Sequence, residues 1–205
     1  MLVIIDYGMG NLHSVQKAIR RIGVESKVAV TAADVESATK LILPGVGHFK
    51  NGISRLREKG LVDLLNKKVI DQKVPILGIC LGMQLFTNHS EEGDVKGFGW
   101  INAQTVKFDM KATSGSWKIP HMGWNNLKIE KQRPVYDGVT GIDALYFVHS
   151  YFVQCNDAKD ILSRTTYGQE FVSSFQKDNI IGMQFHPEKS HGTGLKILTN
   201  FCKGN

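Results

Sequence analysis

Short apolar runs alternate with stretches of helical periodicity through the first half of the chain. Four runs predict short strands, at 2–6, 26–30, 40–43 and 74–79, the first of which is apolar up to Asp6 and expected to be buried. Two intervening stretches carry apolar residues at helical spacing and predict helices, at 12–22 and 52–68. Because consecutive parallel strands are joined by helical crossovers, this alternation predicts an α/β fold, a doubly wound, mostly parallel sheet with helices on both faces.

The pattern changes after about residue 95. Six β-rich segments follow, separated by turns, at 105–108, 126–129, 146–155, 161–166, 171–175 and 180–185. Apolar spacing over 194–201 predicts a closing helix. No linker rich in Pro, Gly or Ser and no internal repeat divides the chain. We therefore expect one domain over 1–205, with an antiparallel extension in its C-terminal half.

The composition is that of a globular chain. Its 205 residues are 42% hydrophobic and 21% charged, which argues against disorder. No apolar stretch approaches the roughly 20 residues of a membrane span, and the first residues lack a secretory signal. We expect a cytosolic protein that does not enter a membrane.

Charge and cysteine content narrow the function classes. The net charge is +6, but its densest basic pairs, Arg20-Arg21 and Lys67-Lys68, have no interleaved aromatic residues. A solvated face or an acidic protein partner is favoured over nucleic acid. Three cysteines without a C-x-x-C pair predict neither a disulfide framework nor a zinc site. The turn at Gly8 lacks the third glycine of a dinucleotide fingerprint, where His13 stands, so no cofactor and no metal are expected.

The strongest local signal is the sequence Gly78-Ile79-Cys80-Leu81-Gly82 after an apolar run. This pattern is typical of a nucleophile elbow, with cysteine in place of serine. A thiol at a helix N-terminus is favoured as the thiolate, and the free N–H groups there can bind an oxyanion. A buried structural cysteine is the competing interpretation, and the elbow alone does not decide between them.

A second signal favours chemistry. An apolar run delivers His186 at its end, and Pro187 stiffens the bend before Glu188. A thiolate needs a base, and an imidazole needs an orienting carboxylate, so Cys80, His186 and Glu188 form a plausible triad. The glycine-rich turn at 44–47 follows another predicted parallel strand, which places it at the same carboxyl edge of the sheet.

The motifs together resemble those of a known family. G-I-C-L-G-M-Q from Gly78 and Q-F-H-P-E-K-S from Gln184 resemble a class I (triad) glutamine amidotransferase, a flavodoxin-like fold. The runs L-P-G-V-G-H-F at 43–49, P-H-M-G-W-N at 120–125 and Y-F-V-H-S-Y at 146–151 narrow the resemblance to the glutaminase subunits of imidazole glycerol phosphate synthase. The resemblance spans nearly the whole chain.

The resemblance implies a mechanism. Cys80 attacks the side-chain amide of glutamine, His186 passes a proton to the leaving ammonia, and Glu188 holds the imidazole. An oxyanion hole is implied at Leu81 and at the Val46-Gly47 peptide. Glutamine binding is implied for Gly45, Gln84, Glu92, Ser150 and Tyr151.

The family also implies a second chain. Its glutaminases pass ammonia to a cyclase subunit with a (β/α)8 barrel, as a heterodimer. The residues that match interface positions are Gly10, Asn11, Trp124, Tyr146 and Lys189. By the same resemblance, the peptide at 44–47 is misoriented until the partner binds its ligand.

Three alternatives remain open at this point. A paralogous glutaminase supplies ammonia for sugar amidation in surface-polysaccharide synthesis, and the segments 99–101 and 108–118 leave room for that interpretation. A catalytically silent regulatory subunit is a second, although all three triad positions are filled. A cysteine hydrolase of the related peptidase or chaperone-like type is a third, but such relatives place a histidine directly after the cysteine, where Leu81 stands.

Overall fold

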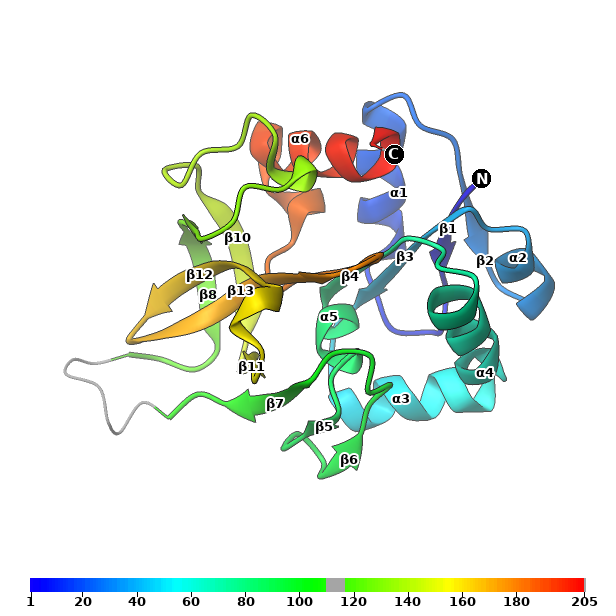
Figure 1. Cartoon of the computed structure of the whole chain (residues 1–205), viewed down its shortest axis with the longest axis horizontal. Coiled ribbons are helices and arrows are strands. Elements are labelled where there is room, and N and C mark those ends of the chain that lie inside the picture. Colours follow the sequence, from blue (N-terminus) through cyan, green and yellow to red (C-terminus); the bar gives the residue numbers. More distant parts are fainter. Residues whose placement is uncertain (110–116, 205) are drawn as a thin grey trace.

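The computed structural model describes residues 1–109 and 117–204. Its main sheet has a parallel half with the strand order β2–β1–β3–β4–β14 (Figure 1). These strands are β1 (Leu2–Ile5), β2 (Ser26–Ala29), β3 (Lys40–Gly45), β4 (Ile76–Cys80) and β14 (Ile180–Met183). Every neighbouring pair among them is parallel, which confirms the predicted parallel sheet.

The sheet continues beyond β14 with antiparallel pairing, as expected. The extension contains β13 (Gln169–Lys177), β11 (Tyr151–Cys155), β7 (Ala103–Lys107), β12 (Ile161–Tyr167), β9 (Lys128–Ile129), β5 (His89–Ser90) and β6 (Val95–Lys96). Only the β5–β7 pair in this part is parallel among the described strands. A separate antiparallel pair, here called the β8–β10 ribbon, joins β8 (His121–Asn125) to β10 (Leu145–His149).

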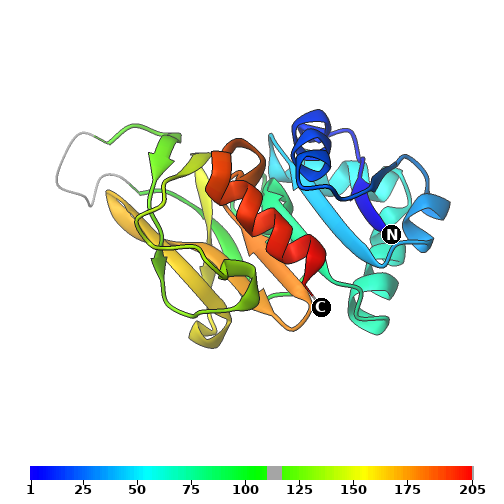
Figure 2. The same cartoon turned by 90° about the horizontal axis from the view of Figure 1, so that it is seen from above.

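Helices cover both faces of the parallel half. One face carries α1 (Leu12–Arg21) and α6 (His191–Lys203), which lie together in Figure 2. The other carries α2 (Ala32–Glu36), α3 (Phe49–Glu58), α4 (Leu61–Asn66) and α5 (Leu81–Leu85). Alternate side chains of β1 divide between the two cores, Leu2 and Ile4 facing α1 and α6, and Val3 and Ile5 facing α3 and α4. Short turns of 3-10 helix lie at Pro134–Tyr136, Ala158–Asp160 and Pro187–Lys189.

Two predicted elements are wrong in their extent. The helix expected over 52–68 is interrupted at Gly60, which adopts the left-handed region with φ 66°, and it ends in a π-helical turn at Lys67–Asp71. The strand expected over 146–155 is two strands in different sheets, separated at Ser150. The pattern missed α2, whose only buried residue is Val35, although Thr31 and Asp34 form a capping box there.

One buried tyrosine carries a hydroxyl without a partner. Tyr7 is fully buried, and its Oη makes no hydrogen bond among the described residues. It packs directly on Gly45, where an added Cβ would lie 2.4 Å from that oxygen. An unpaired buried hydroxyl destabilises the fold, so its removal without a change of shape stabilises it.

Tyr7→Phe is therefore expected to raise the free energy of unfolding by about 1 kcal/mol, measured by urea denaturation. Tyr136→Phe is the matched control, because the Tyr136 hydroxyl is equally buried but hydrogen-bonded to Ser174 Oγ at 2.7 Å. The control variant is expected to lose stability. Equal changes in the two variants would contradict the expectation.

Candidate active site

The carboxyl ends of the parallel strands β3 and β4 open onto one cavity of about 420 Å³. Predicted site residues that line it are Val46, Gly47, Cys80, Leu81, Gln84, Glu92, Ser150 and Tyr151. Gly45 lies beside it, opposite Cys80 in the register of β3 and β4. Residues more than sixty positions apart in the sequence thus meet where the motifs predicted.

Cys80 stands on a strained turn between β4 and α5. Its backbone has φ 54° and ψ −108°, a conformation that costs energy for any residue with a Cβ. The turn is tight because α5 packs directly on β3: a Cβ at Gly82 would lie 1.8 Å from the Leu43 carbonyl oxygen. A Cβ at Gly78 would lie 2.7 Å from the Met83 nitrogen. Both glycines of the elbow motif are therefore required by close backbone approach.

His186 and Glu188 form a buried pair after β14. His186 Nδ1 lies 2.8 Å from Glu188 Oε1, and both side chains are 2% exposed. The His186 backbone N–H donates to the Tyr146 carbonyl at 2.8 Å, which fixes the bend. Among the described residues, His186 Nε2 has no hydrogen-bond partner. That nitrogen is therefore the ring atom available to exchange a proton with a thiol or a substrate.

The charge state of His186 depends on Cys80. Burial by itself lowers the pKa of His186, but the electrostatic interaction with Cys80 and the bond to Glu188 outweigh it and raise the pKa to about 10. The site therefore favours the protonated imidazolium form of His186. The gain in folding stability from this shift is complete below the ordinary pKa near 6.5 and is lost as the pH rises through about 10.

We expect both His186 ring nitrogens to stay protonated up to about pH 9 in nitrogen-15 NMR spectra. In Cys80→Ala, the midpoint should fall, because the strongest interaction that raises the pKa is removed. Cys155→Ala, which removes a thiol outside the cavity, should leave the midpoint unchanged. A midpoint near pH 6.5 for His186 in the wild type would contradict the raised pKa of this residue.

The residues predicted to form the oxyanion hole line the cavity. Leu81 opens α5, so its backbone N–H has no partner within the helix. Val46 and Gly47 line the opposite part of the cavity, and Gly47 has φ 103°, a conformation that favours glycine. Both backbone segments predicted for the oxyanion hole therefore line the cavity that contains Cys80.

The predicted glutamine-binding residues are already engaged with one another or with the backbone. Gln84 Nε2 donates to the Tyr151 carbonyl at 2.9 Å. Glu92 Oε2 accepts the Phe49 N–H at 2.7 Å, which ties the cavity rim to the start of α3. Burial, Glu92 and the neighbouring Glu91 raise the pKa of the Tyr151 phenol. These contacts hold the side chains of Gln84 and Glu92 in place at the cavity.

Sequence reasoning missed three side chains at this site. Gln184 Nε2 donates to Cys80 Sγ at 3.6 Å, and Gln184 is fully buried. His149 lines the cavity and contacts His121, with His121 Nδ1 3.0 Å from His149 Nε2. All three lie inside the motifs that carried the resemblance, so the signal was present, but their pairing depends on tertiary structure.

Three of the predicted interface residues contact one another, and the other two follow β1. Trp124 is 49% exposed and stacks on His191 at 4.9 Å. Tyr146 contacts the Trp124 ring, and Lys189 Nζ lies 5.5 Å from the Tyr146 ring centroid. Gly10 and Asn11 follow β1, with Gly10 against Pro44 and Asn11 capping α1 through Ser14. Trp124, Tyr146 and Lys189 thus form one partly exposed aromatic and cationic group.

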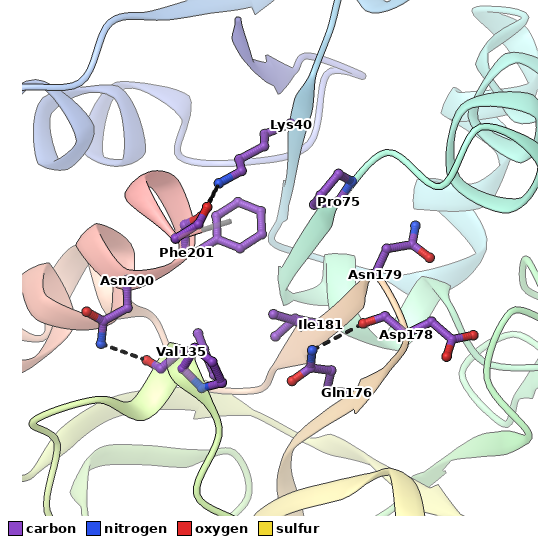
Figure 3. Close-up of a pocket in the computed structure, with 11 residues that line it drawn as sticks. Lys40, Pro75, Val135, Gln176, Asp178, Asn179, Ile181, Asn200 and Phe201 are labelled. Carbon is purple, nitrogen blue, oxygen red and sulfur yellow. Dashed lines mark hydrogen bonds between the residues drawn. The ribbon is translucent and has the colours of Figure 1, made fainter.

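The other two cysteines are placed as packing residues. Cys155 lies in β11 and Cys202 in α6, and burial raises the pKa of each thiol to about 12. A further cavity of about 150 Å³ lies at the amino ends of the parallel strands, near Lys40 and Asn179 (Figure 3). It contains none of the predicted site residues.

Two kinds of feature are absent from the part of the chain that the structure describes. Over residues 1–109 and 117–204, no group of three His, Cys, Asp or Glu side chains is arranged to hold a metal ion. Over the same ranges, no helix has the length and apolar character needed to cross a membrane.

Comparisons with known proteins agree with the geometry. The family model described as glutamine amidotransferase class-I matches residues 3–204. The chain is 53% identical, over 99% of both chains, to imidazole glycerol phosphate synthase subunit HisH 2 of Methanococcus maripaludis. It is 48% identical to subunit HisH 1 of Campylobacter jejuni, over 99% of this chain and 100% of the relative. The structure of PurLQS from Thermotoga maritima shares the fold, with a TM-score of 0.76 at 18% identity over 98% of this chain and 97% of that one. The chain belongs to the class-I glutamine amidotransferases and, among them, to the HisH subunits of imidazole glycerol phosphate synthase.

Proposed function

We propose that this protein is a single glutamine amidotransferase domain over 1–205 that hydrolyses glutamine and supplies the ammonia to a cyclase subunit in histidine biosynthesis. The observation that carries this function is the placement of Cys80, on its strained elbow, in one cavity with the predicted oxyanion donors and beside the buried His186–Glu188 pair. Family membership over the whole chain supports the same reaction.

The thioester forms in the first half of the reaction. The Cys80 thiolate attacks the carbon of the glutamine side-chain amide, and the negative charge develops on the amide oxygen. The N–H groups of Leu81 and of the Val46-Gly47 peptide stabilise that oxygen. His186, protonated at neutral pH, gives its Nε2 proton to the leaving nitrogen, so the C–N bond breaks and ammonia departs.

Water completes the cycle. His186, now neutral, takes a proton from a water molecule that attacks the thioester carbon, and glutamate leaves as the C–S bond breaks. Glu188 keeps the ring in the orientation that both steps require, through its 2.8 Å contact with Nδ1. The cavity residues Gly45, Gln84, Glu92, Ser150 and Tyr151 are proposed to hold the rest of the glutamine.

A second chain is needed for the use of the ammonia. We assign the docking surface to the exposed Trp124 with Tyr146 and Lys189, together with Gly10 and Asn11 after β1. The proposed partner is a (β/α)8-barrel cyclase that forms a heterodimer with this chain. Exposed aromatic residues beside a cationic side chain are typical of protein interfaces.

The acceptor of the ammonia is tested by complementation. A histidine auxotroph that lacks its own glutaminase subunit receives this chain together with the matching cyclase. Growth without histidine supports the histidine pathway. Failure to grow, when the purified pair still releases glutamate from glutamine, would remove the histidine assignment and keep the glutaminase.

One observation favours a second candidate. The relatives from Methanococcus maripaludis and Campylobacter jejuni carry numbered names, HisH 2 and HisH 1, which fits organisms with more than one such glutaminase. A second copy would be free to supply ammonia for sugar amidation in surface-polysaccharide synthesis. Glutaminase activity that depends on a sugar-modifying partner, with no histidine complementation, would select this candidate.

A further inference from the structure

A chain of hydrogen bonds runs from the β8–β10 ribbon to the catalytic sulfur. His121 and His149 face each other directly across the ribbon and are 2% and 6% exposed. His121 Nδ1 lies 3.0 Å from His149 Nε2, and His149 Nδ1 lies 2.8 Å from the Tyr151 carbonyl oxygen. The proposed mechanism uses neither imidazole.

The partners at both ends fix where the protons lie. A carbonyl oxygen can only accept, so His149 Nδ1 must carry the hydrogen that it donates to Tyr151. At the other end, Asn125 Nδ2 donates to the Thr166 carbonyl at 3.0 Å and also lies 3.4 Å from His121 Nε2. An amide nitrogen can only donate, so His121 Nε2 accepts and Nδ1 carries the ring proton. Both imidazoles are then neutral, with every donation pointing toward Tyr151.

The surroundings favour the neutral rings. His121 is stacked between Phe147 and Tyr167, at 4.9 Å and 4.1 Å between ring centroids. His149 contacts the rings of Phe108 and Phe171. Burial lowers the pKa of His121 to about 4, and burial together with the neighbouring His121 lowers that of His149 to about 3, while the Tyr151 carbonyl opposes this.

Beyond Tyr151 the hydrogen bonds continue to Cys80, with donation now pointing away from the Tyr151 carbonyl. The Tyr151 carbonyl also accepts from Gln84 Nε2, at 2.9 Å. The second hydrogen of that nitrogen goes to Gln184 Oε1 at 3.0 Å, and Gln184 Nε2 donates to Cys80 Sγ at 3.6 Å. Because the Tyr151 carbonyl oxygen can only accept, Gln84 must turn Nε2 toward it. This orientation leaves Gln84 Oε1 for a ligand in the cavity.

On the basis of the proposed function, we propose that His121 and His149 form a neutral imidazole relay that positions the glutamine-binding amide of Gln84 through the Tyr151 carbonyl. His149 lies at the cavity wall, and its proposed role is that of a positioning residue that acts on Gln84 through the Tyr151 carbonyl. The relay begins beneath the ribbon surface that carries Trp124, so it also links the proposed docking surface to the pocket.

Two substitutions of the same histidine separate this role from simple packing. In His149→Asn, the Nδ2 amide takes the place of Nδ1 and keeps the donor to Tyr151, whereas His149→Gln places its amide nearer the Nε2 position and loses that donor. In the complex with the cyclase, His149→Gln is expected to raise the KM for glutamine about tenfold with a smaller change in kcat. His149→Asn is expected to restore most of the loss, and His89→Gln, at a histidine outside the cavity, should leave KM unchanged. Equal effects of the two His149 variants, or an effect on kcat alone, would overturn the relay.

A spectroscopic measurement stands independently of activity. Nitrogen-15 NMR of the labelled wild-type chain should show both rings as neutral Nδ1–H tautomers between about pH 5.5 and 8.5. Titration of either ring near pH 6.5, or an Nε2–H tautomer, would overturn the relay even if the glutaminase is active. Absence of glutamate release by the wild-type complex would instead remove the proposed function, and the tautomers alone would then decide whether the relay exists. If a His149 variant does not fold, the spectra of the wild-type chain still test the relay.

Discussion

Cys80→Ala is expected to reduce glutamate release by at least about 10⁴-fold in the presence of the cyclase partner. The proposed reaction passes through a thioester on Cys80 Sγ, and no other thiol lies in the cavity among the described residues. His186 cannot substitute for the sulfur, because its proton serves the leaving ammonia. The oxyanion donors survive the change, so they account for whatever residual rate remains.

The measurement is the initial rate of glutamate formation at saturating glutamine. Cys155→Ala is the matched control, since it removes a buried thiol in β11 that lies outside the cavity. Cys80→Ala should release glutamate at least about 10⁴-fold more slowly than Cys155→Ala. Similar rates for Cys80→Ala and wild type would leave the protein as a non-catalytic subunit.

Gly82→Ala is expected to lower the free energy of unfolding by about 3 kcal/mol or more. The added methyl would lie 1.8 Å from the Leu43 carbonyl oxygen, which belongs to β3 and is held between β1 and β4. Backbone in the middle of a sheet cannot move aside without loss of its ladder hydrogen bonds. The same shift would displace Cys80, two residues away, so activity should fall as well.

Gly192→Ala provides the comparison. Gly192 lies in α6, and an added Cβ meets nothing within 4 Å. Since alanine is the better helix former, this variant should match or slightly exceed the wild type in urea denaturation. If Gly82→Ala unfolds at the same urea concentration as Gly192→Ala, the close packing of α5 on β3 is wrong.

The elbow and the triad could be predicted because their requirements are local. Small residues on both sides of Cys80 are needed for the tight turn, and the clashes at Gly78 and Gly82 give the reason in distances. His186 and Glu188 are two positions apart, so one bend suffices to bring them together. The parallel half of the sheet was predictable for a similar reason, because the buried strands β1, β4 and β14 are each a short, nearly continuous apolar run.

The hydrogen bonds around the cavity could not be predicted in this way. Gln184 meets Cys80 across 104 positions, and His121 meets His149 across 28, so their pairing follows from strand order and register. The apolar run at 146–155 hides the break at Ser150, which lets His149 bond to the carbonyl two residues ahead. In the helical region, apolar spacing continues past Gly60, but only the folded backbone shows its left-handed turn.

Strand β14 has a consequence for the order in which the protein matures. It lies between β4 and β13 in the sheet, although 104 positions separate Gln184, just after β14, from Cys80 at the end of β4. Chains are synthesised from the N-terminus, so Cys80 emerges well before the segment that carries His186. Until β14 is inserted, Cys80 has neither its base nor the amide of Gln184. A nascent chain thus carries Cys80 without its catalytic partners. The active site is complete only after β14 has joined the sheet.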